Sequence, residues 1–175
     1  MTSYIICGGA GFLMLVAAGV AIILRLAKVT LRKQVLAISG RFPQALSTSA
    51  QGALVTYWAL RRIAAVDRSP YGRTGSVYSL VASRGHLTIV RGREAKVLAD
   101  FTAEQVADVR VDTTSVLLAD YTTLFFGIRA GDRTFELPVR VNGPMATSLR
   151  TASTEWAKAR GDAIVKTVRG ESVGT

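Results

Sequence analysis

The sequence predicts an N-terminal transmembrane helix followed by a mainly-β (α+β) domain, a curved antiparallel sheet or open barrel closed by a C-terminal helix. Three observations predict this class. The run from Tyr4 to Leu24 holds 21 residues without a charge. Short segments of apolar residues at a period of two, separated by glycine-containing turns, fill the middle of the chain. One apolar stripe at helical spacing lies near the C-terminus.

The apolar run 4–24 spans roughly 31 Å as a helix, close to the thickness of a bilayer hydrocarbon core. A cleaved signal peptide, the main alternative, has its positive charge before the apolar stretch. Here the basic residues follow the run, at Arg25, Lys28, Arg32 and Lys33. The positive-inside rule therefore predicts a single-pass plasma-membrane protein with its N-terminus outside and its C-terminal domain cytoplasmic.

Residues 25–38 are predicted to continue this helix as a basic juxtamembrane extension. Leu31, Val35 and Ile38 recur at helical intervals, while the basic residues lie on another face. These cations suit anionic lipid headgroups, although an ordinary stop-transfer flank has the same pattern. Residues 39–52 are rich in serine, threonine, glycine and alanine and are predicted to be a linker.

Residues 53–66 fit a helix or a strand, and periodicity does not separate the two. The segment is the first part of a predicted domain over residues 53–160, and we favour a strand. If it is helical, Tyr57 and Trp58 beside Arg61 and Arg62 would suit an interfacial position.

The rest of the domain is expected to be hairpins and one helix. The predicted strands cover 77–83, 86–90, 96–101, 106–111, 115–119, 124–130 and 134–141, and Thr102 to Gln105 has the spacing of a capping box. Pro138 indicates an edge or a bulge in the last strand. A helix over 144–160 follows, with Gly161 at its end and a flexible tail over 161–175.

Three segments carry a resemblance to a known kind of module: the hairpin SLVASRGHLTIVRG, the segment ADFTAEQVADVRV and the helix beginning GPMATSLRTASTEW. Over roughly residues 54–160 the order of elements resembles the pleckstrin-homology-like cytoplasmic modules of bacterial, notably actinobacterial, single-pass membrane proteins. The resemblance implies a scaffold that binds lipid headgroups or proteins and is rarely catalytic.

The net charge of +10 is unevenly distributed. Residues 25–93 hold 12 basic residues and one acidic residue, whereas residues 94–175 hold 10 basic and 11 acidic residues. Five arginines fall in or near successive predicted turns: Arg68, Arg73, Arg84, Arg91 and Arg93. If these turns share one end of the barrel, they form a basic rim that suits phosphate; otherwise they are solvated and point in different directions. No nucleic-acid-binding signature accompanies them, so the expected contacts are anionic lipid or a membrane protein partner.

Catalytic and metal-binding patterns are not found in the sequence. His86 is the only histidine and Cys7 the only cysteine, and no nucleophile motif or phosphate-binding loop surrounds them. We therefore expect no enzyme, no cofactor and no metal site. The predicted function is a membrane-anchored binding or scaffold module; the alternative is an accessory subunit of a transporter or envelope-assembly complex, with an apolar contact near Leu124-Phe125-Phe126.

Overall fold

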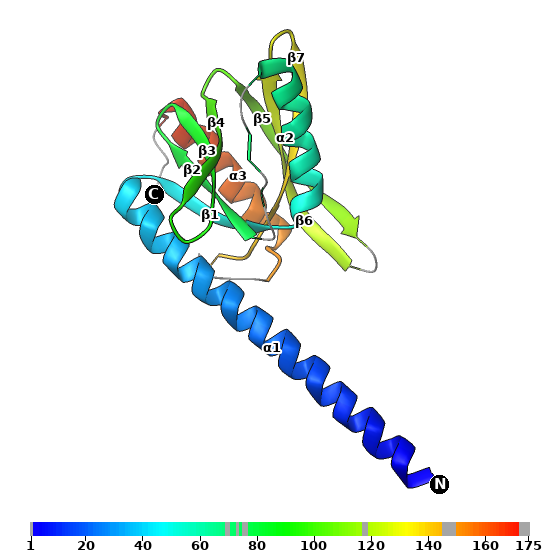
Figure 1. Cartoon of the computed structure of the whole chain (residues 1–175). Helices are drawn as coiled ribbons and strands as arrows, with labels where there is room; N and C mark the ends of the chain where they lie inside the picture. Colours follow the sequence, from blue (N-terminus) through cyan, green and yellow to red (C-terminus); the bar gives the residue numbers. More distant parts are fainter. Residues whose placement is uncertain are drawn as a thin grey trace.

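A computed structural model describes residues 2–68, 71–72, 74, 77–116, 119–144 and 150–171, with side chains except those of residues 2–13, 53 and 116. One long helix, α1 (Thr2–Arg41), extends from an α+β domain that holds the rest of the described chain (Figure 1). Alanine-, leucine- and valine-rich sequence with no proline before residue 43 lets this helix run without a break.

The domain is built on one seven-stranded antiparallel sheet with the strand order β4-β3-β2-β1-β7-β6-β5. Its strands are β1 (Leu46–Gln51), β2 (Val77–Ser83), β3 (His86–Arg91), β4 (Lys96–Thr102), β5 (Val106–Val116), β6 (Ala119–Ala130) and β7 (Arg133–Val141). Strands β1 and β7 share only two residue pairs, at the C-terminal ends of both strands. The sheet therefore consists of two meanders joined at a short corner (Figure 1).

Two further helices close the domain. Helix α2 (Ala53–Asp67) packs mainly on β7, and α3 (Thr154–Arg169) packs mainly on β5. Leu60 and Ile63 of α2 and Ile164 of α3 join Phe101 and Phe126 of the sheet in one buried core. The predicted fold class, an apolar N-terminal helix and a mainly-β domain packed by a C-terminal helix, is confirmed.

The predicted linker over residues 39–52 is wrong in most of its length. Helix α1 continues to Arg41, and residues 46–51 form β1, which pairs with β2 along its whole length. The strand lacked an alternating apolar signal because its buried side chains are polar: Thr48 and Ser49 are each 3% exposed. Small hydroxyl side chains are typical of linkers, so composition alone concealed a central strand.

Residues 53–66, for which we favoured a strand, form helix α2. Tertiary contacts decide the competition, because Leu60 and Ile63 are buried at helical spacing and Thr56 donates a hydrogen bond to the Pro138 carbonyl at 2.7 Å. The same contact explains why Pro138 is tolerated in β7. Strand β1 pairs with β7 only at residues 140 and 141, so on the β1 side Pro138 faces α2 instead of a strand, as expected for an edge-like position.

The predicted C-terminal helix is shifted along the chain. It begins at Thr154 instead of residue 144, because Ser153 caps it by accepting a hydrogen bond from the Trp156 amide at 3.3 Å. It runs past Gly161 to Arg169, so part of the predicted flexible tail is helical. Gly170, in the left-handed conformation, ends it. Residues 145–149 and 172–175 lie outside the described residues.

The predicted strands over 77–83, 86–90, 96–101, 106–111, 124–130 and 134–141 are confirmed, but a separate strand over 115–119 is wrong: residues 115–116 end the longer β5, residue 119 begins the longer β6, and residues 117–118 lie outside the described residues. These two strands pair from Val106–Ile128 to Val116–Ala119 and extend beyond β7 as a two-stranded ribbon. At the predicted capping box, the Gln105 side chain accepts from the Thr102 amide at 3.0 Å, but the segment is a turn between β4 and β5.

Candidate functional site

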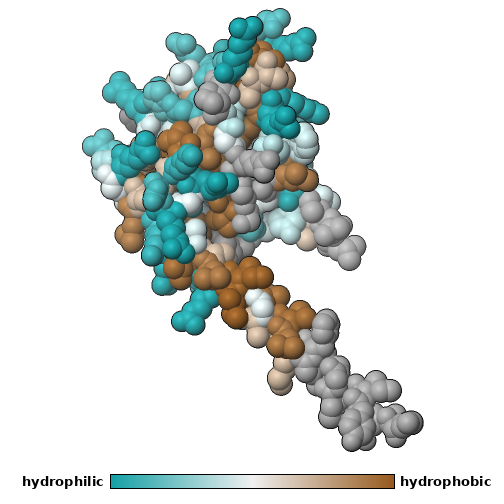
Figure 2. Space-filling view, in the orientation of Figure 1, coloured by the Kyte–Doolittle hydropathy of each residue, from teal (hydrophilic) through white to brown (hydrophobic). Residues whose placement is uncertain are grey.

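Helix α1 has the length and composition of a membrane-crossing helix. The portion of α1 whose side chains are described, Met14 to Arg41, has an apolar stretch with mean hydropathy 2.0 that is only 6% buried in the domain. Met14 is 77% exposed and Leu24 51% exposed, so the apolar surface continues along the helix (Figure 2). Forty residues of helix extend about 60 Å, twice a hydrocarbon core, so one part of α1 lies outside any bilayer that the other part crosses.

The C-terminal part of α1 is packed on the outer face of β2 and β3. Leu31, Gln34 and Ile38 are at most 2% exposed. The Gln34 amide nitrogen donates to Ser79 Oγ at 3.2 Å and to the Val90 carbonyl at 3.0 Å. In this docked segment, residues 31–42, Leu31 and Ile38 of the predicted helical pattern are buried together with Gln34, a polar residue that the apolar spacing did not reveal.

The docked segment fixes the direction in which α1 leaves the domain. Gln34 lies beside Ser79 and Val90, whereas Phe42 lines a 530 Å³ cavity with Ser83 and Arg84 at the far end of β2. Toward its N-terminus the helix therefore passes the end of the sheet where β1 and β3 finish, β2 begins and β7 finishes. We call this the α1-exit end (Figure 1).

The four predicted juxtamembrane cations lie on α1 before or within the docked segment. All four are exposed: Arg25, Lys28, Arg32 and Lys33. The helix holds no acidic residue from position 2 to position 41.

The four turn arginines that the structure describes do not form one rim. Arg91 and Arg93 lie at the α1-exit end: Arg91 is the last residue of β3, and Arg93 follows in the next turn. Arg84 lies at the opposite end, against Gly170 after α3, and Arg68 follows α2 on the side of the β6–β7 turn. Consecutive turns of an antiparallel meander alternate between the two ends of a sheet, so successive turns are separated rather than gathered. Arg73 lies outside the described residues.

Helix α2 presents an exposed face that sequence reasoning left conditional on a helix. Leu54 is 68% exposed and Trp58 52% exposed, with the Arg61 guanidinium 5.5 Å from the Trp58 ring centre. The helix starts at the α1-exit end, after Gln51, and reaches the β6–β7 turn, where Val66 lies against Gly131. Its aromatic half is therefore nearer to the exit of α1 than its C-terminal half is.

The predicted apolar contact near Leu124-Phe125-Phe126 is largely internal. Leu124 and Phe126 are fully buried in the core, and β6 lies between β5 and β7. Phe125 points to the outer face, as alternation along a strand requires, and the Arg110 guanidinium covers it at 4.2 Å from the ring centre.

Reactive groups in the described part of the chain are tied to ordinary partners. The His86 ring lies 3.0 Å from an Asp100 carboxylate oxygen, and both side chains are about half exposed. Asp100 also accepts a hydrogen bond from Thr88 at 2.7 Å. No group of three potential metal ligands occurs among the described residues. These contacts describe a hydrogen-bonded group on the surface that links two neighbouring strands.

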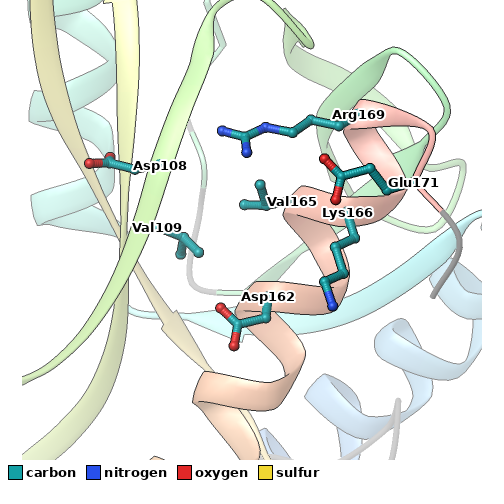
Figure 3. A pocket seen from close by; sticks show the side chains of 7 residues that line it. All are labelled: Asp108, Val109, Asp162, Val165, Lys166, Arg169 and Glu171. Carbon is teal, nitrogen blue, oxygen red and sulfur yellow. The ribbon is translucent and has the colours of Figure 1, made fainter. Parts of the chain in front are cut away.

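A shallow hollow between β5 and α3 has both signs of charge (Figure 3). Its volume is about 300 Å³, and it is lined by Asp108, Val109, Asp162, Val165, Lys166, Arg169 and Glu171. Arg169 donates to the Ala107 carbonyl at 2.6 Å and thereby ties α3 to β5. Balanced charges on a docked helix fit a structural role.

Neither a family model, nor a curated protein, nor a solved structure matches this chain.

Proposed function

We propose that this protein is a non-enzymatic, single-pass membrane-anchored binding module whose β domain docks on anionic lipid of the cytoplasmic leaflet. The N-terminus lies outside and the domain inside, because the basic residues of α1 all follow its apolar run. The resemblance to pleckstrin-homology-like modules supports a scaffold that binds headgroups or proteins, and the meander closed by a C-terminal helix agrees with it.

The observation that carries this proposal is the docked segment of α1. If residues 4–24 cross the bilayer, Leu31 is only about 10 Å farther along the helix, so the α1-exit end lies next to the headgroups. Two sources of positive charge then face the same leaflet: the exposed cations of α1 and the β3–β4 turn with Arg93 and Lys96. Each of these basic residues contributes on the order of 1 kcal/mol near an anionic surface.

The test measures how close each end of the domain lies to the bilayer. The full chain, with Cys7 replaced by serine, is labelled with a fluorophore at Glu94→Cys or Asp132→Cys and reconstituted in nanodiscs with a headgroup-labelled acceptor. Both positions are exposed turn residues, on the β3–β4 and β6–β7 turns. We expect stronger energy transfer from position 94, increasing with the anionic lipid fraction and decreasing with salt.

A pair of charge variants provides the matched control. Arg93→Gln with Lys96→Gln removes two exposed cations at the α1-exit end, and Arg129→Gln with Arg133→Gln removes two exposed cations around the β6–β7 turn. Only the first pair is expected to weaken the anionic-lipid response. Equal transfer from both labels, or the same response in neutral and anionic discs, contradicts the proposal.

A second candidate function, an accessory subunit that binds a membrane protein, is favoured by the groove beside α2. Val55, Trp58, Phe125, Phe135 and Pro138 line about 520 Å³ of open volume there. A photo-crosslinking residue at Trp58 would then capture one defined membrane protein in native membranes, whereas the same residue at the exposed Lys158 of α3 would not. Identical products from both positions would exclude this function.

A further inference from the structure

Arg140 places a buried positive charge on the outer face of β7 at the α1-exit end. The residue is 9% exposed and stands opposite Thr123 of β6 and Gln51 of β1. Its neighbours Val139 and Val141 point into the core, so alternation along the strand turns the Arg140 side chain outward.

The guanidinium is held on three sides. Its Nε donates to Thr114 Oγ1 at 3.2 Å, and the Tyr121 ring lies 4.9 Å away. Thr114 is in turn hydrogen-bonded to Thr123 at 2.7 Å. On the remaining side Gly52, at φ +83°, lets the backbone approach closely: a Cβ there would lie 2.9 Å from Arg140 Cδ and 3.0 Å from Nη1. These contacts fix the plane of the guanidinium, and among the described residues neither Nη atom donates a hydrogen bond.

No acidic side chain pairs with this charge. All 12 acidic side chains lie in the described part, and none of them forms an ion pair with Arg140. The acid in the same cross-strand row, Asp112, is two strands away and accepts hydrogen bonds from the Thr113 amide and from Arg110 at 2.9 Å, which in that order lower its pKa.

The inner side of β7 does not provide an anion either. Tyr78, the buried residue there that Arg140 influences electrostatically, keeps its phenolic proton because burial raises its pKa, and its hydroxyl is paired with Thr56 at 2.8 Å. An unpaired buried charge is unfavourable in a folded protein, so a site of this kind favours an external anion.

We propose that the Nη edge of Arg140 binds one phosphate group, with Tyr121 and the Gly52 backbone as the walls of the site. A planar guanidinium presents two parallel N–H donors that match two phosphate oxygens. Resting on the proposed function, the supplier of the phosphate is the phospholipid headgroup at the α1-exit end; a free phosphate offers the same chemistry. This contact is separate from the exposed cations, since it depends on one oriented side chain.

The test uses the full chain with ¹⁵N-labelled arginine and follows the Arg140 Nε–H resonance. The phosphate-free reference is a maltoside micelle; the arms are inorganic phosphate added to the micelle, phosphatidylcholine nanodiscs, and nanodiscs containing phosphatidylglycerol. A shift in the phosphatidylglycerol discs that phosphate in micelles does not reproduce assigns a lipid headgroup. A saturating shift with inorganic phosphate, and no further change in discs, assigns free phosphate and still supports the site.

No shift in any arm overturns the phosphate site, whether or not energy transfer shows that the domain docks. Conversely, a shift with inorganic phosphate in a chain that fails to dock keeps the site and removes the proposed function. The two proposals therefore fail separately.

Two variants test the geometry, with affinity read from the amide resonances of Thr114 and Tyr121. Arg140→Lys keeps the charge but loses the paired donors and is expected to bind phosphate about tenfold more weakly or worse. Gly52→Ala keeps the arginine and displaces it, which preserves the test if the lysine variant misfolds. The control Arg133→Lys, at an exposed position, is expected to bind like the wild type. Wild-type affinity in a folded Arg140→Lys variant contradicts the proposal.

Discussion

Replacement of Gln34 tests whether α1 is docked on the sheet as the structure places it. The side chain is fully buried, its amide nitrogen donates two hydrogen bonds to β2 and β3, and its Oε1 has no partner. The Val90 carbonyl that accepts one of these bonds lies at a register shift between β3 and β4. Gln34→Leu removes the bonds and the unpaired oxygen together, whereas Gln34→Glu replaces a donor with a carboxylate oxygen facing an acceptor.

The two variants differ in pH dependence. The leucine variant loses two hydrogen bonds of about 1 kcal/mol each, but it no longer buries the unpaired Oε1 atom, whose desolvation destabilises the wild type. Its free energy of unfolding should therefore change by about 1 kcal/mol or less. A buried glutamate facing an acceptor has a raised pKa, so its folded form is favoured below the unfolded pKa of about 4.3 and weakens as the pH rises. If the folded pKa reaches 8, the loss between pH 5 and pH 8 is about 4 kcal/mol.

The assay combines urea unfolding in detergent with hydrogen exchange of residues 31–41, at pH 5 and at pH 8. Exchange is needed because α1 can detach while the β domain remains folded, and the loss then appears as local opening. Wild type and Gln34→Leu serve as controls for every other titrating group. If Gln34→Glu and Gln34→Leu show the same small, pH-independent change, the side chain is solvated and the direction of α1 that we infer is wrong.

Three further predictions concern the β domain. Burial raises the pKa of the Tyr78 phenol, so above pH 10 the folded state keeps a proton that the unfolded state releases. The free energy of unfolding of the wild type should therefore fall above pH 10 by up to about 1.4 kcal/mol per pH unit. In urea unfolding, the Tyr78→Phe variant should show a flatter pH dependence. Gly161→Val should cost about 1–3 kcal/mol, because a Cβ alone would lie 3.1 Å from Leu124 Cδ2; no change in the unfolding midpoint would mean that α3 is not seated on β6 there. Ser153→Ala should cost about 1 kcal/mol by removing the cap from the Trp156 amide, whereas Ser153→Asp should restore it in the same thermal melt.

The parts of the fold that sequence reasoning predicted are those with a strong local signal. The hairpin of β2 and β3 was located because Gly85 takes a positive φ in a two-residue turn between alternating strands. Strand β1 was not predicted, because its buried Thr48 accepts a hydrogen bond from a distant partner, Arg160 of α3, which is 112 residues along the chain. No local pattern records such a contact.

The residues of the candidate site also fall into those that the sequence could predict and those that it could not. The cations of α1 follow from composition and helical period, so they could be assigned from the sequence. The grouping of the turn arginines could not, because it depends on which end of the sheet each turn occupies. Arg140 carried no signal at all: in the sequence it is one basic residue in a nearly neutral half, and its meaning comes from the absence of a neighbouring acid in three dimensions.

In the membrane-anchored arrangement that we propose, the unbroken passage of α1 from its apolar stretch into the docked segment couples the orientation of the domain to that of the span. An α-helix advances about 1.5 Å and turns about 100° with each residue. Adding a single residue before Leu31 would therefore raise the domain slightly but swing it by more than a quarter turn, presenting a different side to the leaflet. Adding seven would restore the azimuth and lift the domain by about 10 Å. In that arrangement, the number of residues between the apolar run and Leu31 sets both the distance of the domain from the bilayer and its rotation about the helix axis.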